Sequence, residues 1–193
     1  MKKLILFIAF LLFTCNNINA QENKLGIKTG LNVAYILGEN TSMFDARASF
    51  HFGAIVDFLI SDKFSIQPEV LYSCQGVTYN DGGYDGKFKL DYLNVPVVLK
   101  YKVVEGFSLE CGPQIGVLLS AKNEFNSSEE SGEEDIKDLI NSTDFSINFG
   151  LGSELENGLF FSGRYILGIS EIFKDNEGNN QNGVFQISIG YFF

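Results

Sequence analysis

The sequence has no tryptophan, a single histidine and few basic residues. Because His51 is the only histidine, a histidine-rich metal site is excluded. There are 14 lysine and arginine residues against 24 aspartate and glutamate residues, which gives a net charge of −10. This charge argues against nucleic acid or an anionic membrane surface as a partner. No segment approaches the roughly 20 consecutive apolar residues that a membrane-spanning helix needs.

The N-terminus has the pattern of a secretory signal peptide. A basic start at Lys2 is followed by an apolar run over residues 4–13, and the small residue Ala20 ends the segment. The sequence therefore predicts residues 1–20 as a signal peptide cleaved after Ala20. Residues 21–193 are then one exported domain, an outer-membrane β-barrel domain by the arguments below.

Polar and apolar residues alternate in eight segments of this exported domain, as they do in strands whose two faces meet different environments. The segments are 25–36, 48–60, 64–79, 88–101, 107–121, 145–156, 159–173 and 184–193. Most exceed the five or six residues usual for a soluble strand, and their number is even, as in single-chain bacterial outer-membrane barrels. Alternation alone leaves a soluble sandwich and a lipocalin-like barrel open as alternatives.

The signal peptide, the strand lengths and the tyrosines at strand ends, such as Tyr35 and Tyr101, favour a membrane barrel over these folds. The connectors add an independent clue, because short and long ones alternate strictly. The short connectors are 61–63, 102–106 and 157–158, and the long ones are 37–47, 80–87, 122–144 and 174–183. Outer-membrane barrels alternate short periplasmic turns with long extracellular loops in the same way. The sequence therefore predicts an all-β fold, an eight-stranded antiparallel up-and-down transmembrane β-barrel in the bacterial outer membrane.

The chain ends on NGVFQISIGYFF, in which Tyr191 and Phe193 fall on the apolar face. A soluble protein usually leaves its last residues polar and frayed. A terminal aromatic residue suits a membrane interface instead, and this ending resembles the signal by which the barrel assembly machinery recognises its clients. Tyr191 and Phe193 are therefore predicted to act as a terminal assembly signal.

Several motifs follow one another along the exported domain. They are FSIQPEVLYSCQG from Phe64, YLNVPVVLKY from Tyr92, CGPQIGVLLSAK from Cys111, the stretch 135–173 and the closing ISIGYFF. As a set in this order they resemble the PorT-like outer-membrane β-barrel family of Bacteroidetes. The resemblance implies an eight-stranded barrel in the outer membrane. The namesake of that family is associated with protease secretion through the type IX pathway, but no residue of this sequence carries that role over.

The polar face of the strands carries seven charged residues that strand direction places in the periplasmic half of the lumen. They are Lys28, Asp57, Glu69, Lys100, Glu110, Glu154 and Arg164. Because an eight-stranded barrel has room only for side chains, unpaired charges there would carry a large desolvation cost. We expect a hydrogen-bonded ion network centred on Arg164, with Gln67, Gln114 and Ser162 around it, that plugs the lumen.

The sequence predicts a structural or interaction role without catalysis or a cofactor. Its expected partners are outer-membrane lipid, the barrel assembly machinery and an envelope or secretion protein, whereas nucleic acid is not expected. A narrow barrel that binds or conducts a small solute is the alternative, although the inward residues Tyr92, Val98, Leu118 and Phe160 favour a filled lumen. A barrel hydrolase with His51 as general base is a third reading, but no GxSxG setting accompanies it.

The stretch 124–138 concentrates seven carboxylates. It is expected to be a solvated surface loop with a short helix near DIKDLI, and binding of cations or of a basic partner is the alternative. Cys74 and Cys111 are expected to stay unpaired, because they lie on the third and fifth strands, farther apart than the roughly 7 Å that a disulfide allows.

Overall fold

The computed structural model describes residues 23–38, 41–81, 84–126, 131–174 and 180–193. The predicted signal peptide and its cleavage after Ala20 lie outside these residues. Within the described ranges, no helix has the length and apolar character needed to cross a membrane.

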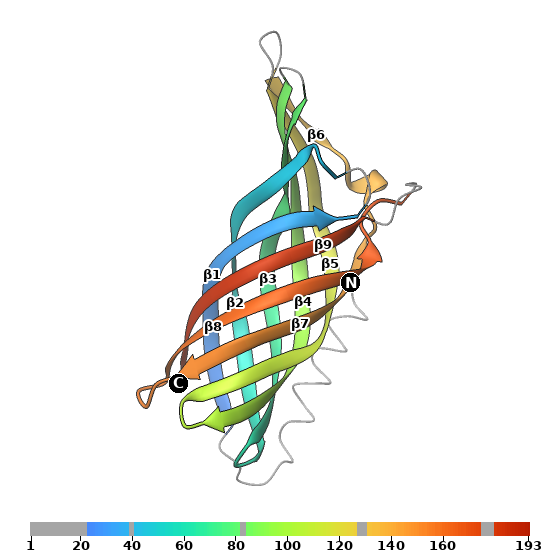
Figure 1. Ribbon diagram of the computed structural model, residues 1–193. Coiled ribbons are helices and arrows are strands. Elements are labelled where there is room, and N and C mark those ends of the chain that lie inside the picture. The colour runs from blue at the N-terminus through green and yellow to red at the C-terminus, as the bar shows by residue number, and fades with distance from the viewer. Residues whose placement is uncertain (1–22, 39–40, 82–83, 127–130, 175–179) are drawn as a thin grey trace.

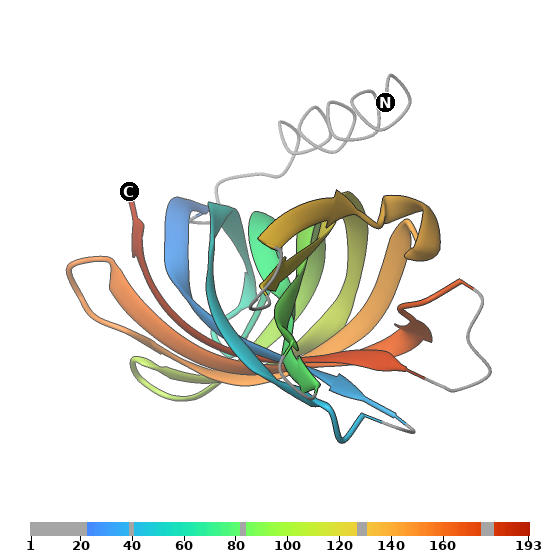
Figure 2. The same cartoon turned by 90° about the horizontal axis from the view of Figure 1, so that it is seen from above.

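In the described part of the chain, eight long antiparallel strands form one closed sheet (Figures 1 and 2). They are β1 (Lys24–Leu37), β2 (Phe44–Ser61), β3 (Phe64–Asp81), β4 (Tyr84–Val104), β5 (Phe107–Asn126), β7 (Thr143–Glu154), β8 (Leu159–Glu171) and β9 (Gln181–Phe192). Each strand pairs with the next around the ring, β5 pairs with β7, and the pairing of β1 with β9 closes it. The predicted eight-stranded up-and-down barrel is confirmed.

The barrel wall separates an apolar outer face from a polar interior. Exposed apolar residues on the strands include Leu25, Ile27, Leu31, Phe50, Phe52, Leu99, Leu109, Phe149, Leu151, Phe185, Ile187 and Ile189. Buried polar residues include Lys28, Asn32, His51, Gln67, Glu69, Ser73, Asn94, Gln114, Asn148, Arg164, Gln186 and Ser188. This distribution is the reverse of that in a water-soluble domain and matches a barrel surrounded by lipid.

Strands β3, β4 and β5 continue beyond the ring at the end that carries the long connectors (Figure 1). Asp81 pairs with Tyr84 at the tip of the β3–β4 hairpin, so most of the predicted loop 80–87 is strand. The loop prediction was wrong there because Asn80, Asp81 and the neighbouring glycines are residue types depleted in strands.

The acidic stretch 124–138 also departs from the predicted solvated loop. The last residues of β5 pair with a short ninth strand, β6 (Ser131–Asp135), and the predicted helix is a single 3₁₀ turn, η2 (Lys137–Leu139). The Glu133 carboxylate beside Lys122 raises the pKa of that ammonium group. Among the residues with described positions, no group of histidine, cysteine, aspartate and glutamate side chains is arranged to hold a metal.

An apolar cluster fills the interior at the long-connector end. It contains Ile36, Val77, Leu90, Tyr92, Leu118, Ala121, Ile136, Ile140 and Ile172. Three of these residues, Ile136, Ile140 and Ile172, come from the connectors that follow β6 and β8, and a bridge between Ile140 and Phe173 holds the two connectors together. The connectors therefore fold back over the barrel and pack against its strands.

The two described cysteines are unpaired, as predicted. Cys111 is exposed on β5, and Cys74 is buried on β3.

We expect Gly53→Ala to destabilise the barrel. A Cβ atom at Gly53 would lie 2.0 Å from the backbone oxygen of Val70, so β2 and β3 would have to move apart. The free energy of unfolding should fall by about 1–3 kcal/mol. At Gly163 nothing lies within 4 Å of such a Cβ, so Gly163→Ala is the matched control, with a change within about 0.5 kcal/mol. Urea unfolding in detergent micelles measures both, and equal stability of the two variants would contradict the packing argument.

Candidate functional site

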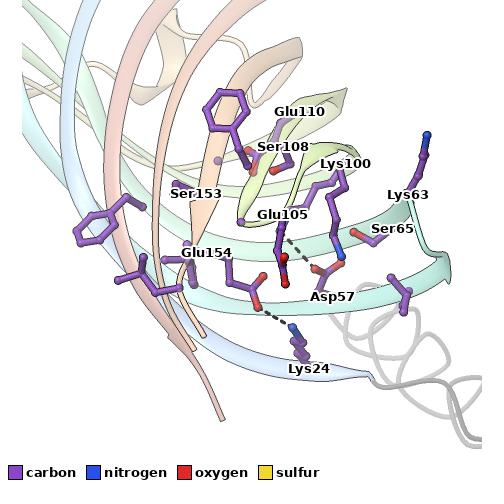
Figure 3. A pocket seen from close by; sticks show the side chains of 18 of the residues that line it. Lys24, Asp57, Lys63, Ser65, Lys100, Glu105, Ser108, Glu110, Ser153 and Glu154 are labelled. Carbon is purple, nitrogen blue, oxygen red and sulfur yellow. Dashed lines mark hydrogen bonds and ion pairs between the residues drawn. The ribbon is translucent and has the colours of Figure 1, made fainter. Parts of the chain in front are cut away.

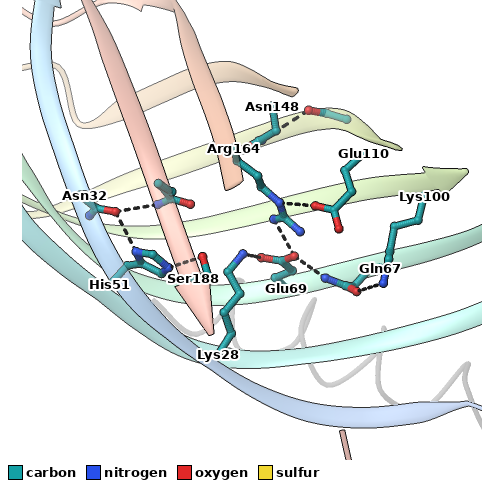
Figure 4. Close-up of polar contacts among 12 residues, drawn as sticks. Lys28, Asn32, His51, Gln67, Glu69, Lys100, Glu110, Asn148, Arg164 and Ser188 are labelled. Carbon is teal, nitrogen blue, oxygen red and sulfur yellow. Dashed lines mark hydrogen bonds and ion pairs between the residues drawn. The ribbon is translucent and has the colours of Figure 1, made fainter. Parts of the chain in front are cut away.

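Glu69 of β3, rather than the predicted Arg164, lies at the centre of a buried ion network (Figure 4), because Lys28, Arg164 and Gln67 all contact its carboxylate. Its Oε2 accepts a hydrogen bond from Lys28 Nζ at 2.9 Å, and its Oε1 lies 2.7 Å from Arg164 Nη1. The three side chains are at most 1% exposed. Burial this complete strengthens the attraction between the charges, and it also makes the loss of either partner costly.

The network extends from this centre in two directions. Arg164 Nε donates to Glu110 Oε2 at 2.6 Å, so one guanidinium from β8 bridges carboxylates of β3 and β5. Gln67 Nε2 donates to Glu69 Oε1 at 2.7 Å, and its own Oε1 accepts from Lys100 Nζ at 3.1 Å. The guanidinium group of Arg164 suits contact with two carboxylates, because its N–H groups are fixed in one plane.

Lys100 completes the network by donating to Asp57 Oδ2 at 3.3 Å. The structure thus joins Lys28, Glu69, Arg164, Glu110, Lys100 and Asp57 through direct contacts and one glutamine. Residues from β1, β2, β3, β4, β5 and β8 meet in it. The network therefore connects strands on different sides of the lumen.

Three residues depart from the predicted arrangement. Glu154 lies apart from the network and pairs at 2.6 Å with Lys24, a partner the sequence reasoning missed because Lys24 precedes the first predicted segment. Gln114 donates to Ser146 at 3.1 Å rather than to a charged group. Ser162 Oγ has no hydrogen-bond partner among the described residues. Spacing along one strand does not reveal which side chains meet across the lumen.

His51 lies in a second buried polar group beside Lys28 (Figure 4). Its Nδ1 lies 2.8 Å from Asn32 Oδ1 and therefore donates, since an amide oxygen only accepts. Its Nε2 then accepts from Ser188 Oγ at 2.9 Å. His51 is 0% exposed and Ser188 3% exposed, so this serine–histidine pair presents no accessible nucleophile. The contacts tie β1, β2 and β9 together.

Tyr191 and Phe193 lie on the outer face of the barrel wall, where they are 43% and 74% exposed. Their ring centroids are 5.7 Å apart in an edge-to-face arrangement. The Phe193 N–H donates to Leu25 O at 2.8 Å, so the last residue of the chain is held by the first strand. Their role as an assembly signal stays a prediction.

The comparisons with known proteins agree with this barrel. A family model described as outer membrane protein beta-barrel domain matches residues 19–174. The chain belongs to this family. It is therefore an outer-membrane β-barrel, and because such barrels place their short turns in the periplasm, the extended ends of β3, β4 and β5 face the cell exterior.

Several solved structures are similar to this barrel in fold. Ail, the attachment invasion locus protein of Yersinia pestis, matches with a TM-score of 0.54 and 14% identity over 90% of this chain and 100% of that chain. Neisserial surface protein A matches with a TM-score of 0.56 and 9% identity over the same shares. A major outer membrane protein from Thermus thermophilus gives 0.50 and 10%, again with 90% and 100% coverage. No curated protein matches by sequence. Identities this low show the fold alone.

We expect Glu69→Gln to destabilise the barrel strongly, because Lys28 and Arg164 would stay buried without their shared carboxylate. The loss should be about 3–5 kcal/mol. Glu154→Gln is the matched control: it removes one carboxylate whose partner, Lys24, is 42% exposed, so the loss should be about 0–1 kcal/mol. Urea titration of the refolded variants measures both values. Similar losses at the two positions would show that burial does not set the strength of these pairs.

Proposed function

We propose that this protein is a closed barrel with a structural or interaction role in the outer membrane, accessory to protein secretion or envelope integrity. The ion network carries this proposal. Lys28, Glu69, Arg164 and Glu110 occupy the lumen with paired, buried charges. An eight-stranded barrel has an interior that side chains can fill, so these contacts leave no room for a wide aqueous path.

The apolar cluster at the extracellular end supports the same conclusion. Tyr92, Leu118 and Val77 are at most 3% exposed, and Ile136 and Ile140 from the connector pack on them. An ion entering from outside would first have to cross this apolar layer, where it would lose its hydration. Two successive barriers, one apolar and one charged, favour a closed barrel over the conducting alternative.

A resemblance in the sequence gives the proposal its finer form. The motifs from Phe64, Tyr92 and Cys111 resemble PorT-like barrels of Bacteroidetes, which favours a secretion or envelope protein as the partner. In this proposal residues 1–20 direct export and are removed after Ala20. Tyr191 and Phe193 then present the barrel to the assembly machinery, and the apolar belt contacts outer-membrane lipid.

A solute-binding or conducting barrel would need a path past Glu69 and Arg164. Planar-bilayer recording tests this directly: wild-type protein should give no steady single-channel currents. Arg164→Ala removes the cation between Glu69 and Glu110, so the two carboxylates repel each other and admit water and cations; because the apolar layer then remains as the one barrier, only brief, small currents are expected. Glu154→Gln is the control and should stay silent. Steady currents from wild-type protein would overturn the proposed closed lumen.

The protein should fractionate with the outer membrane and migrate differently on a denaturing gel before and after boiling. The reason is that a closed ladder of interstrand hydrogen bonds has no free edge from which detergent can begin to unfold it. Sucrose-gradient separation of the membranes and paired heated and unheated gel samples measure the two properties. Recovery as a soluble periplasmic monomer without detergent would contradict the prediction.

A further inference from the structure

A cavity of about 780 Å³ opens at the periplasmic end of the barrel (Figure 3). It lies among the turns that join β2 to β3, β4 to β5 and β7 to β8, and its lining includes the buried residues Glu110 and Phe160, both 6% exposed. Asp57, Lys100 and Glu110 belong both to this lining and to the ion network, so the network borders the inner end of this periplasmic cup. Its volume lies within the roughly 300–1,000 Å³ of ligand-binding pockets.

The lining of the cup is nearly balanced in charge. Four lysines and five carboxylates line it: Lys24, Lys63, Lys100, Lys102, Asp57, Glu105, Glu110, Glu154 and Glu156. Serine hydroxyls at positions 65, 108 and 153 lie between them (Figure 3). A wall with both signs of charge complements a ligand that also carries both, rather than a simple cation or anion.

Asp57 has an unused hydrogen-bond acceptor in this wall. The residue is 9% exposed, its Oδ2 accepts from Lys100, and its Oδ1 has no partner among the described residues. The Lys100 ammonium group has other contacts besides Asp57, since it also donates to Gln67 and lies 5.5 Å from the Phe192 ring centroid. A buried carboxylate oxygen without a donor is costly, so an N–H group from a ligand would be stabilising there.

Two lysines form a cationic edge at the rim. The backbone N–H of Lys102 donates to Lys63 O at 2.8 Å, which places the β2–β3 and β4–β5 turns side by side. The described residues include no ion-pair partner for either ammonium group. Lys63 and Lys102 are therefore suited to a carboxylate held at the mouth of the cup, while Asp57 offers an acceptor inside it.

We propose that the periplasmic cup binds a short peptide with free termini. Its terminal ammonium group contacts Asp57, its backbone meets the serine hydroxyls, and its carboxylate lies near Lys63 and Lys102. The inference deepens the proposed interaction role, on which it rests in taking this ligand as the partner, whereas the site itself is defined by the lining of the cup.

Isothermal titration calorimetry of the detergent-purified outer-membrane protein tests the proposal with trialanine as the probe. Trialanine should bind saturably at one site. N-acetyl-trialanine lacks the ammonium charge and should bind about tenfold more weakly, because a charge-assisted hydrogen bond is lost. Trialanine amide lacks the carboxylate and should bind about threefold more weakly, since the rim lysines are exposed.

Variants locate the binding. Asp57→Asn should weaken trialanine binding about tenfold, whereas Glu134→Gln, an exposed change on β6 outside the cup, should leave it within about twofold. If Asp57→Asn fails to fold, the comparison of trialanine with N-acetyl-trialanine on wild-type protein still tests whether the cup recognises the terminal ammonium group. Absence of saturable heat up to millimolar trialanine, or equal binding of the acetylated peptide, would overturn the proposal.

Conductance is measured separately on the same preparations. Steady currents together with peptide binding would contradict the closed lumen and leave the peptide site standing. Silent bilayers without peptide binding would contradict the peptide site alone. The two proposals can therefore fail independently.

Discussion

The pairing of β1 with β9 is the interaction on which the rest of the structure depends. Lipid offers no hydrogen-bond partner to a free strand edge, so a sheet in a membrane must close on itself. The register runs from Gly26 opposite Phe192 to Leu37 opposite Gln181, and the Phe193 N–H extends it by one contact to Leu25. Closure also creates the narrow interior in which charges from strands far apart in the chain come into contact.

Much of this fold could be predicted from the sequence, because the wall of a barrel has the same two-residue period as its strands. The alternation around Ile27, Phe52 and Leu99 marks the outer face directly. The extensions of β3, β4 and β5 were not predicted, because residue types typical of turns occur near Asp81. These segments are strands because they pair with their neighbours. Tertiary pairing overrides local preference there.

The candidate site was predictable in its composition but not in its contacts. Alternation places Glu69 and Arg164 inside the barrel, and burial in a narrow lumen requires such charges to pair. Which groups pair depends on the stagger between strands, which no single strand encodes. Glu154 was therefore assigned to the network although it meets Lys24 near the rim, and the contact of His51 with Ser188 joins residues 137 positions apart.

Glu69 is shared by Lys28 and Arg164, and this sharing has an evolutionary consequence. A substitution of Glu69 is harmful while both cations remain, yet the same substitution becomes far less costly once Lys28 has been replaced by an uncharged residue, because Arg164 still pairs with Glu110. The effects of changes at these three positions are thus strongly non-additive. During evolution, Lys28, Glu69 and Arg164 should therefore be replaced in a particular order, because only some orders of substitution keep the protein folded.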